Sequence, residues 1–137
     1  METEGQFAPA SAAEARERYE ALGPTAQVVV KEVAKAMGLD AETYEERVTS
    51  EVVETARDVL FAESLAVQVG TMDEFESWRA DTDCEVTLVG AENVDHVVWH
   101  AVPFAEQAVA ATFQSERRAA VGTLRRQAFG RIYREVV

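Results

Sequence analysis

Apolar side chains in the first 64 residues recur at spacings of three and four, which places them on one side of a helix. Ser11 and Glu14 form a capping-box pattern that begins the first helix, and Gly23-Pro24 is expected to end it. Three further helices are predicted at residues 24–37, 40–48 and from 50 to about 64. The first half of the chain is therefore predicted to be helical throughout.

The spacing of apolar residues changes to two at Leu65, and the alternation of leucine and valine up to Gly70 predicts a short strand. A second capping-box pattern follows and begins a short helix. Residues 84–89 and 96–102 are typical of two strands, and residues 90–95 of the turn between them. Together these segments predict a β-hairpin.

With Gly90 facing Asp95, the hairpin would have an apolar face and a more polar one. Trp99 belongs to the apolar face and is expected to be buried. His96 and His100 belong to the other face, where His100 would lie opposite Glu85.

The last third of the chain, from Pro103 to Val137, is the only third that contains more basic than acidic residues. We expect one long helix here after a break at Pro103-Phe104, with one apolar stripe facing the core. A neighbouring face is basic and aromatic, and Gly122 beside it leaves room for another backbone. The residues of this candidate partner-binding face are Arg118, Arg125, Arg126, Phe129 and Tyr133.

A competing interpretation of the same residues is structural. Phe129 and Tyr133 would widen the core-facing stripe, since aromatic residues at helical spacing often belong to a core. The arginines would then pair with the acidic residues of the chain itself.

These patterns predict a single α+β domain over residues 1–137, with residues 1–10 flexible. Its N-terminal half is helical, its sheet is small, three-stranded and largely antiparallel, and its long C-terminal helix packs on that sheet.

The charge of the chain is strongly negative and unevenly distributed. Twenty-five acidic and thirteen basic residues give a net charge of −12, and only Lys31 and Lys35 are lysines. Such a balance argues against DNA, nonspecific nucleic acid or anionic membranes as main partners. Abundant carboxylates with little lysine suit a salt-accumulating, halophilic cytoplasm, in which repulsion is screened. The acidic start of the chain and the lack of a long apolar run favour a cytoplasmic protein without a membrane segment.

No motif in the sequence identifies a catalytic residue, a cofactor or a metal site. His96 and His100 would lie roughly 13 Å apart along a strand at about 3.3 Å per residue, too far to chelate one ion together. The segment 31–48 has the spacing of a helix-turn-helix, but its second helix is acidic and would repel DNA. An enzyme is therefore the less favoured class.

Four segments together resemble a small family of uncharacterised proteins of halophilic archaea. They are Asp95-His-Val-Val-Trp-His100, Ala111-Thr-Phe-Gln114, the run from Thr123 to Arg131 and the run from Ala26 to Lys35. The resemblance implies a compartment and supplies no activity, catalytic residue or cofactor.

Two functions remain open at this point. The favoured one is a non-catalytic interaction or regulatory protein whose basic-aromatic face binds another protein, a second copy or structured RNA. The alternative is a small enzyme or ligand-binding domain with a pocket between the sheet and the C-terminal helix, lined by Glu85, His96 and His100.

The charge distribution predicts that the fold depends on salt. Lowering the ionic strength lengthens the Debye length from about 3 Å at 1 M to about 30 Å at 0.01 M, which unscreens the repulsion between acidic residues. Circular dichroism should therefore show a lower melting temperature at low salt. A melting curve that does not change over this range would contradict the halophilic interpretation.

Overall fold

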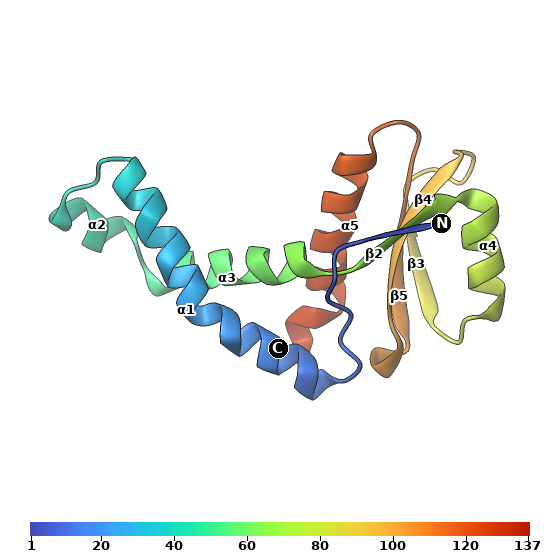
Figure 1. The fold of residues 1–137 in the computed structure, drawn as a ribbon, viewed down its shortest axis with the longest axis horizontal. Coiled ribbons are helices and arrows are strands. Elements are labelled where there is room, and N and C mark those ends of the chain that lie inside the picture. The colour runs from blue at the N-terminus through green and yellow to red at the C-terminus, as the bar shows by residue number, and fades with distance from the viewer.

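A computed structural model describes residues 1–137 as a sheet covered on both faces, with a helical arm projecting from one side (Figure 1). The helices are α1 (Ala12–Ala36), α2 (Ala41–Arg47), α3 (Ser50–Ser64), α4 (Met72–Asp81) and α5 (Arg117–Arg131). The strands are β1 (Glu2–Glu4), β2 (Val67–Thr71), β3 (Glu85–Val89), β4 (His96–Val102) and β5 (Gln107–Phe113). Two short 3-10 helices complete the chain at Pro103–Ala105 and Tyr133–Glu135. The helical arm consists of α1, α2 and α3.

The sheet has five strands in the order β1-β2-β4-β5-β3. All neighbours are antiparallel except β3 and β5, which are parallel. The prediction of a three-stranded, largely antiparallel sheet was wrong, and so was the hairpin between β3 and β4. Strand β5 lies between them, so Glu85 pairs with Gln107 rather than with His100. Residues 1–10, for which we expected flexibility, include β1 at one edge of this sheet.

Strand β5 was missed because its sequence lacks the alternation of a half-buried strand. Residues 108–111 are all buried, since α4 and α5 cover opposite faces of the sheet. A strand buried on both faces is continuously apolar, and here the run is rich in alanine, which favours helices. We therefore assigned this segment to the C-terminal helix, which in fact begins only at Arg117.

Helix α1 continues through Gly23-Pro24, where the sequence predicted a stop. Proline removes one helical hydrogen bond, a local cost that tertiary contacts can offset. From α3, the Nε–H of Arg57 donates to the Tyr19 carbonyl oxygen at 2.6 Å, and its guanidinium lies over the Tyr19 ring. Packing of α1 against α3 thus keeps one helix where local rules predict two.

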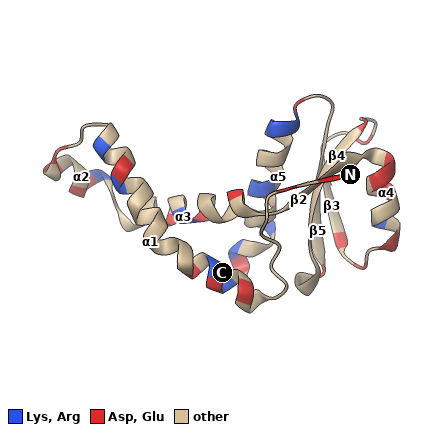
Figure 2. Ribbon diagram, viewed as in Figure 1, with Lys and Arg blue, Asp and Glu red and all other residues tan.

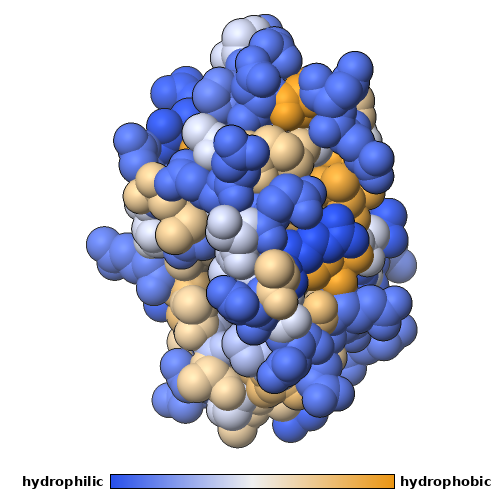
Figure 3. Space-filling view, turned by 90° about the vertical axis from the view of Figure 1, so that its right-hand side faces the viewer, coloured by the Kyte–Doolittle hydropathy of each residue, from blue (hydrophilic) through white to orange (hydrophobic).

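The grouping of residues on the two faces of β4 is correct, but the face of His100, for which we expected a more polar character, is buried as well. Val97 and Trp99 pack under α4 with Phe75, and Trp99 is 1% exposed, as expected. Val98 and Val102 face α5 in the larger core cluster. The view from the α4 side shows mostly hydrophilic residues with apolar patches between them (Figure 3).

The strand order can be tested by engineered disulfides in a Cys84→Ser background. Glu85→Cys with Gln107→Cys should form a cross-link, because paired residues on neighbouring strands have the Cα separation that a disulfide needs. Val89→Cys with His96→Cys, which the hairpin would pair, should not, because β5 separates these strands. Non-reducing gel migration distinguishes the outcomes, and the reverse result would restore the hairpin.

Candidate functional site

Helix α5 carries the basic charge of the chain and has two different sides. Ala120, Val121, Leu124 and Ala128 are buried against the sheet and α3. The helix contains five arginines and no acidic residue. Figure 2 shows a band of basic residues along this helix. The acidic strand β1 crosses beside this band.

A recess of about 720 Å³ lies between the N-terminal segment, the end of α3 and α5. We call it the arginine recess. Val121 is its one hydrophobic lining residue, and the others are charged or glycine. The lining residues are Glu4, Gly5, Glu63, Arg117, Arg118, Val121, Gly122 and Arg125.

Arg117 closes one end of the arginine recess by binding the N-terminal strand. Its Nη2 donates to Glu2 Oε2 at 2.6 Å and to Glu4 Oε1 at 3.0 Å. The hydrogen bond and the positive charge of Arg117 lower the pKa of the Glu2 carboxyl. Glu2 is exposed, and Arg117 and Glu4 are only half-buried, so this network positions β1 rather than adding much stability.

Arg125 lies deeper and is tied to the backbone. Its Nε donates to the Leu65 carbonyl oxygen at 3.0 Å and its Nη2 to the Glu4 carbonyl oxygen at 3.5 Å. Oε2 of Glu63 lies 3.7 Å from Nη1 of Arg125, and the Arg125 side chain is only 13% exposed. Arg125 therefore joins α5 to the start of β2 and to β1.

Arg118 and Arg126 have no such role. Both are exposed, and no carboxylate lies within ion-pair distance of either. Arg126 makes one long hydrogen bond to Thr123 on its own helix. A side chain at Gly122 would meet only the Arg126 guanidinium, at 3.4 Å, so the floor beside these arginines is open.

The aromatic members of the predicted face lie in the core. Phe129 is 4% exposed and Tyr133 is fully buried. Both pack against Phe61 of α3, at centroid distances of 5.7 and 5.1 Å. The structure thus brings together the arginines of the candidate face but turns its aromatic rings inward, as the structural interpretation expected.

The structure does not bring Glu85, His96 and His100 to one pocket. Glu85 begins β3 at an edge of the sheet, and His96 stacks on Phe113 at the start of β4. His100 is buried under α5, near the other end of β4. No group of three or more His, Cys, Asp and Glu side chains is arranged to hold a metal ion.

His100 instead links β4 to the C-terminal segment. Its Nδ1 lies 2.6 Å from the Ala66 carbonyl oxygen and its Nε2 lies 2.7 Å from the Tyr133 hydroxyl. A carbonyl only accepts, so Nδ1 carries the proton and Nε2 accepts from Tyr133. Burial, together with the nearby charge of Arg125, lowers the pKa of His100, although the bond to Ala66 opposes the shift.

Comparison with known families gives one match, which covers residues 6–134, nearly the whole chain. The chain belongs to the Family of unknown function (DUF5809). No match was found among curated proteins or among solved structures. None of the helices of this DUF5809 protein is both long and apolar enough to cross a bilayer.

Sequence reasoning missed Arg117, Glu2 and Glu4 as parts of the site. Two signals were available in the DUF5809 chain. Arg118 and Arg125 are seven residues apart, which returns them to nearly the same side of a helix, and Arg117 and Arg126 flank that side. Glu2 and Glu4 are two residues apart, which places them on one face of a strand.

The buried His100 predicts acid sensitivity of this DUF5809 protein. Its pKa is lower in the folded state than in the unfolded chain, so the unfolded state takes up the proton first as the pH falls. The histidine's contribution to stability is complete above about pH 6.5 and is lost as the pH falls below that value.

We expect the melting temperature of the wild type to decrease more steeply from about pH 7.5 to about pH 5.5 than that of His100→Gln. Glutamine keeps one donor for Ala66 and one acceptor for Tyr133 but does not titrate. Tyr133→Phe is the matched control, because it removes the hydroxyl and leaves the histidine. Equal slopes for the wild type and His100→Gln would contradict this assignment.

Proposed function

We propose that this protein is a non-catalytic interaction protein of a salt-rich, halophilic cytoplasm, and that the arginine recess binds an acidic segment of another protein. The observation that carries the proposal is the concentration of guanidinium groups around one open recess in an otherwise acidic chain. Carboxylates match the planar, forked geometry of arginine, which binds them through two parallel hydrogen bonds.

The arginines have separate tasks in this proposal, and Arg126 lies beside the recess, next to its lining residue Gly122. Arg117 and Arg125 are already bound to β1, to Leu65 and to Glu63, so they shape the recess. Arg118 and Arg126 have no carboxylate of the chain within reach and are available to a partner. Arginine is also among the residues that most often dominate binding energy.

A protein partner is favoured over RNA by the surroundings of the recess. Glu2, Glu4 and Glu63 lie around it, and the whole chain carries −12. An extended phosphate backbone would meet these charges over a long path. A short acidic segment that enters the recess would meet mainly the two free arginines.

The proposal is tested with a fluorescein-labelled peptide of six glutamates, by anisotropy, at the lowest salt at which the chain remains folded. Arg118→Gln with Arg126→Gln should raise the dissociation constant about tenfold, since two exposed ion pairs contribute about 0–1 kcal/mol each. The melting temperature should stay nearly constant because both side chains are exposed.

Arg79→Gln with Arg131→Gln is the control, because it removes the same charge at two exposed positions outside the recess. It should bind the peptide as the wild type does. Equal weakening by both double variants, or no binding by the wild type, would contradict the proposal. Tighter binding of a labelled RNA hairpin than of the peptide would replace the protein partner by RNA.

A further inference from the structure

The outer part of the helical arm presents an apolar groove on one side. Val29, Val33 and Met37 line it from α1, with exposed fractions of 39, 53 and 62%. Val52 lines the groove from α3 and is 42% exposed. Val59 lies seven residues further along the same side of α3 and is 51% exposed. The groove has a volume of about 340 Å³, and nine of its eleven lining residues are hydrophobic.

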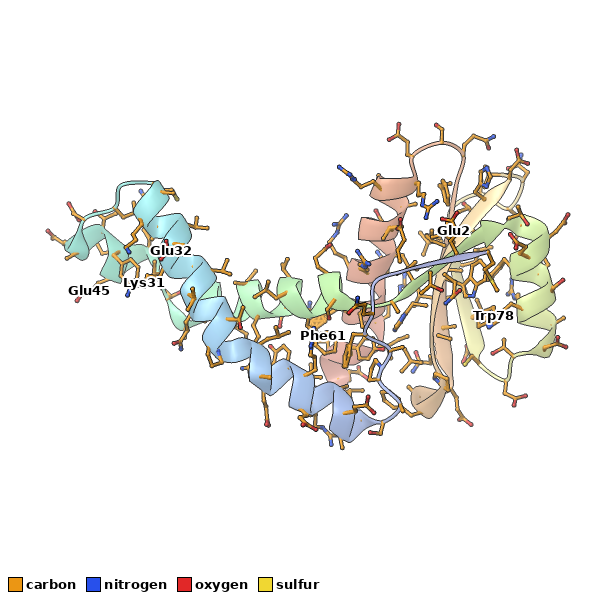
Figure 4. The ribbon with its side chains drawn as sticks, viewed as in Figure 1. Glu2, Lys31, Glu32, Glu45, Phe61 and Trp78 are labelled. Atoms are coloured by element: carbon orange, nitrogen blue, oxygen red, sulfur yellow. The ribbon has the colours of Figure 1, made fainter.

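The groove is almost free of charge in a chain of which 28% is charged. Arg47 is the single charged residue that lines it. Lys31 and Lys35 lie on another side of α1, because they are two residues out of phase with the valines at 29 and 33. Figure 4 shows Lys31, Glu32 and Glu45 at the outer end of the arm.

The outer arm also lacks a core of its own. Its buried residues on α1 are small, namely Ala26, Val30 and Ala34, and α2 buries none. On α3 the buried residues are Phe61 and Ala62, at the end near the sheet. A hairpin of two helices with so little buried surface gains stability when another apolar surface covers it.

We propose that the groove is covered by the same groove of a second copy, so that two arms form an antiparallel four-helix interface. This proposal does not depend on the arginine recess. A symmetric dimer joins a patch to its identical copy, which an apolar patch with a single charged residue, Arg47, permits with little repulsion. For a chain of net charge −12, this is the surface on which a second copy meets the least like charge.

The size of the groove and the charge of the arm tip support the same arrangement. Two helices over about 13 residues form a face of about 20 by 20 Å, and packing two such faces buries roughly 1,000 Å². That total is near the lower limit for a specific interface. The arm tip carries Asp40, Glu42, Glu45 and Glu46 beside Arg47, so an antiparallel arrangement keeps the two acidic tips apart.

Sedimentation analysis in concentrated salt tests the dimer with a pair of matched variants. The wild type should sediment at twice its mass of 15.1 kDa. Val33→Glu should raise the dissociation constant by at least about a hundredfold, because each copy would bury an unpaired charge. Val28→Glu should remain dimeric, because Val28 is exposed on the same helix about 140° around from Val33 and does not line the groove.

A wild type that stays monomeric up to about 100 μM, or equal dissociation by both variants, would overturn the proposal. A second measurement does not require a charge in the groove. In a Cys84→Ser background, Thr55→Cys lines the groove from α3 and should cross-link two copies, whereas Glu45→Cys at the tip should not. Cross-linking at Glu45→Cys alone, or at neither position, would overturn the antiparallel arrangement.

Discussion

The aromatic packing around Phe61 holds together segments that are distant in the sequence. Rings of Phe7, Tyr19, Phe129 and Tyr133 surround it at centroid distances between 5.1 and 6.0 Å. Figure 4 shows Phe61 where the helical arm meets α5. Edge-on and tilted contacts of this kind add to the energy of burial and fix relative orientation. The direction of the arm and the position of α5 on the sheet both depend on this cluster.

A polar link extends the cluster into the sheet. Tyr133 packs on Phe61 and donates its hydroxyl to His100 of β4, which in turn binds the Ala66 carbonyl just before β2. Both ring nitrogens of the buried histidine are therefore satisfied, which avoids the cost of an unpaired polar group. The same packing that excludes water from His100 also keeps it neutral.

The arginines of α5 show how one residue type serves two purposes. Arg117 and Arg125 reach the acidic N-terminal strand and the backbone at Leu65, so they fasten β1 and α5 to the sheet. Arg118 and Arg126 point to regions where the chain offers no carboxylate and remain in solvent. The basic surface and the apolar groove therefore lie on different parts of the molecule. The basic surface is on α5 beside the sheet, and the groove is on α1 and α3, which project away from the sheet as the helical arm (Figure 1).

Elements whose signals are local could be predicted from the order of residues alone. The two capping-box patterns, at Ser11 and at Thr71, bind the backbone as predicted, and the alternation along β4 correctly predicted that Trp99 is buried. The sequence also located the basic charge on the last helix, because charge and helical phase can be read from residue order.

The remaining features depend on contacts between residues that are distant in the chain, so local patterns could not predict them. Strand β5 is a strand because β4 and β3 pair with it on either side, although its alanines favour a helix. Helix α1 passes Pro24 because α3 supports it. The positions of Phe61, Leu65 and Glu4 in the folded chain decide which arginines are free and which aromatic rings are buried. No spacing along the sequence encodes these positions.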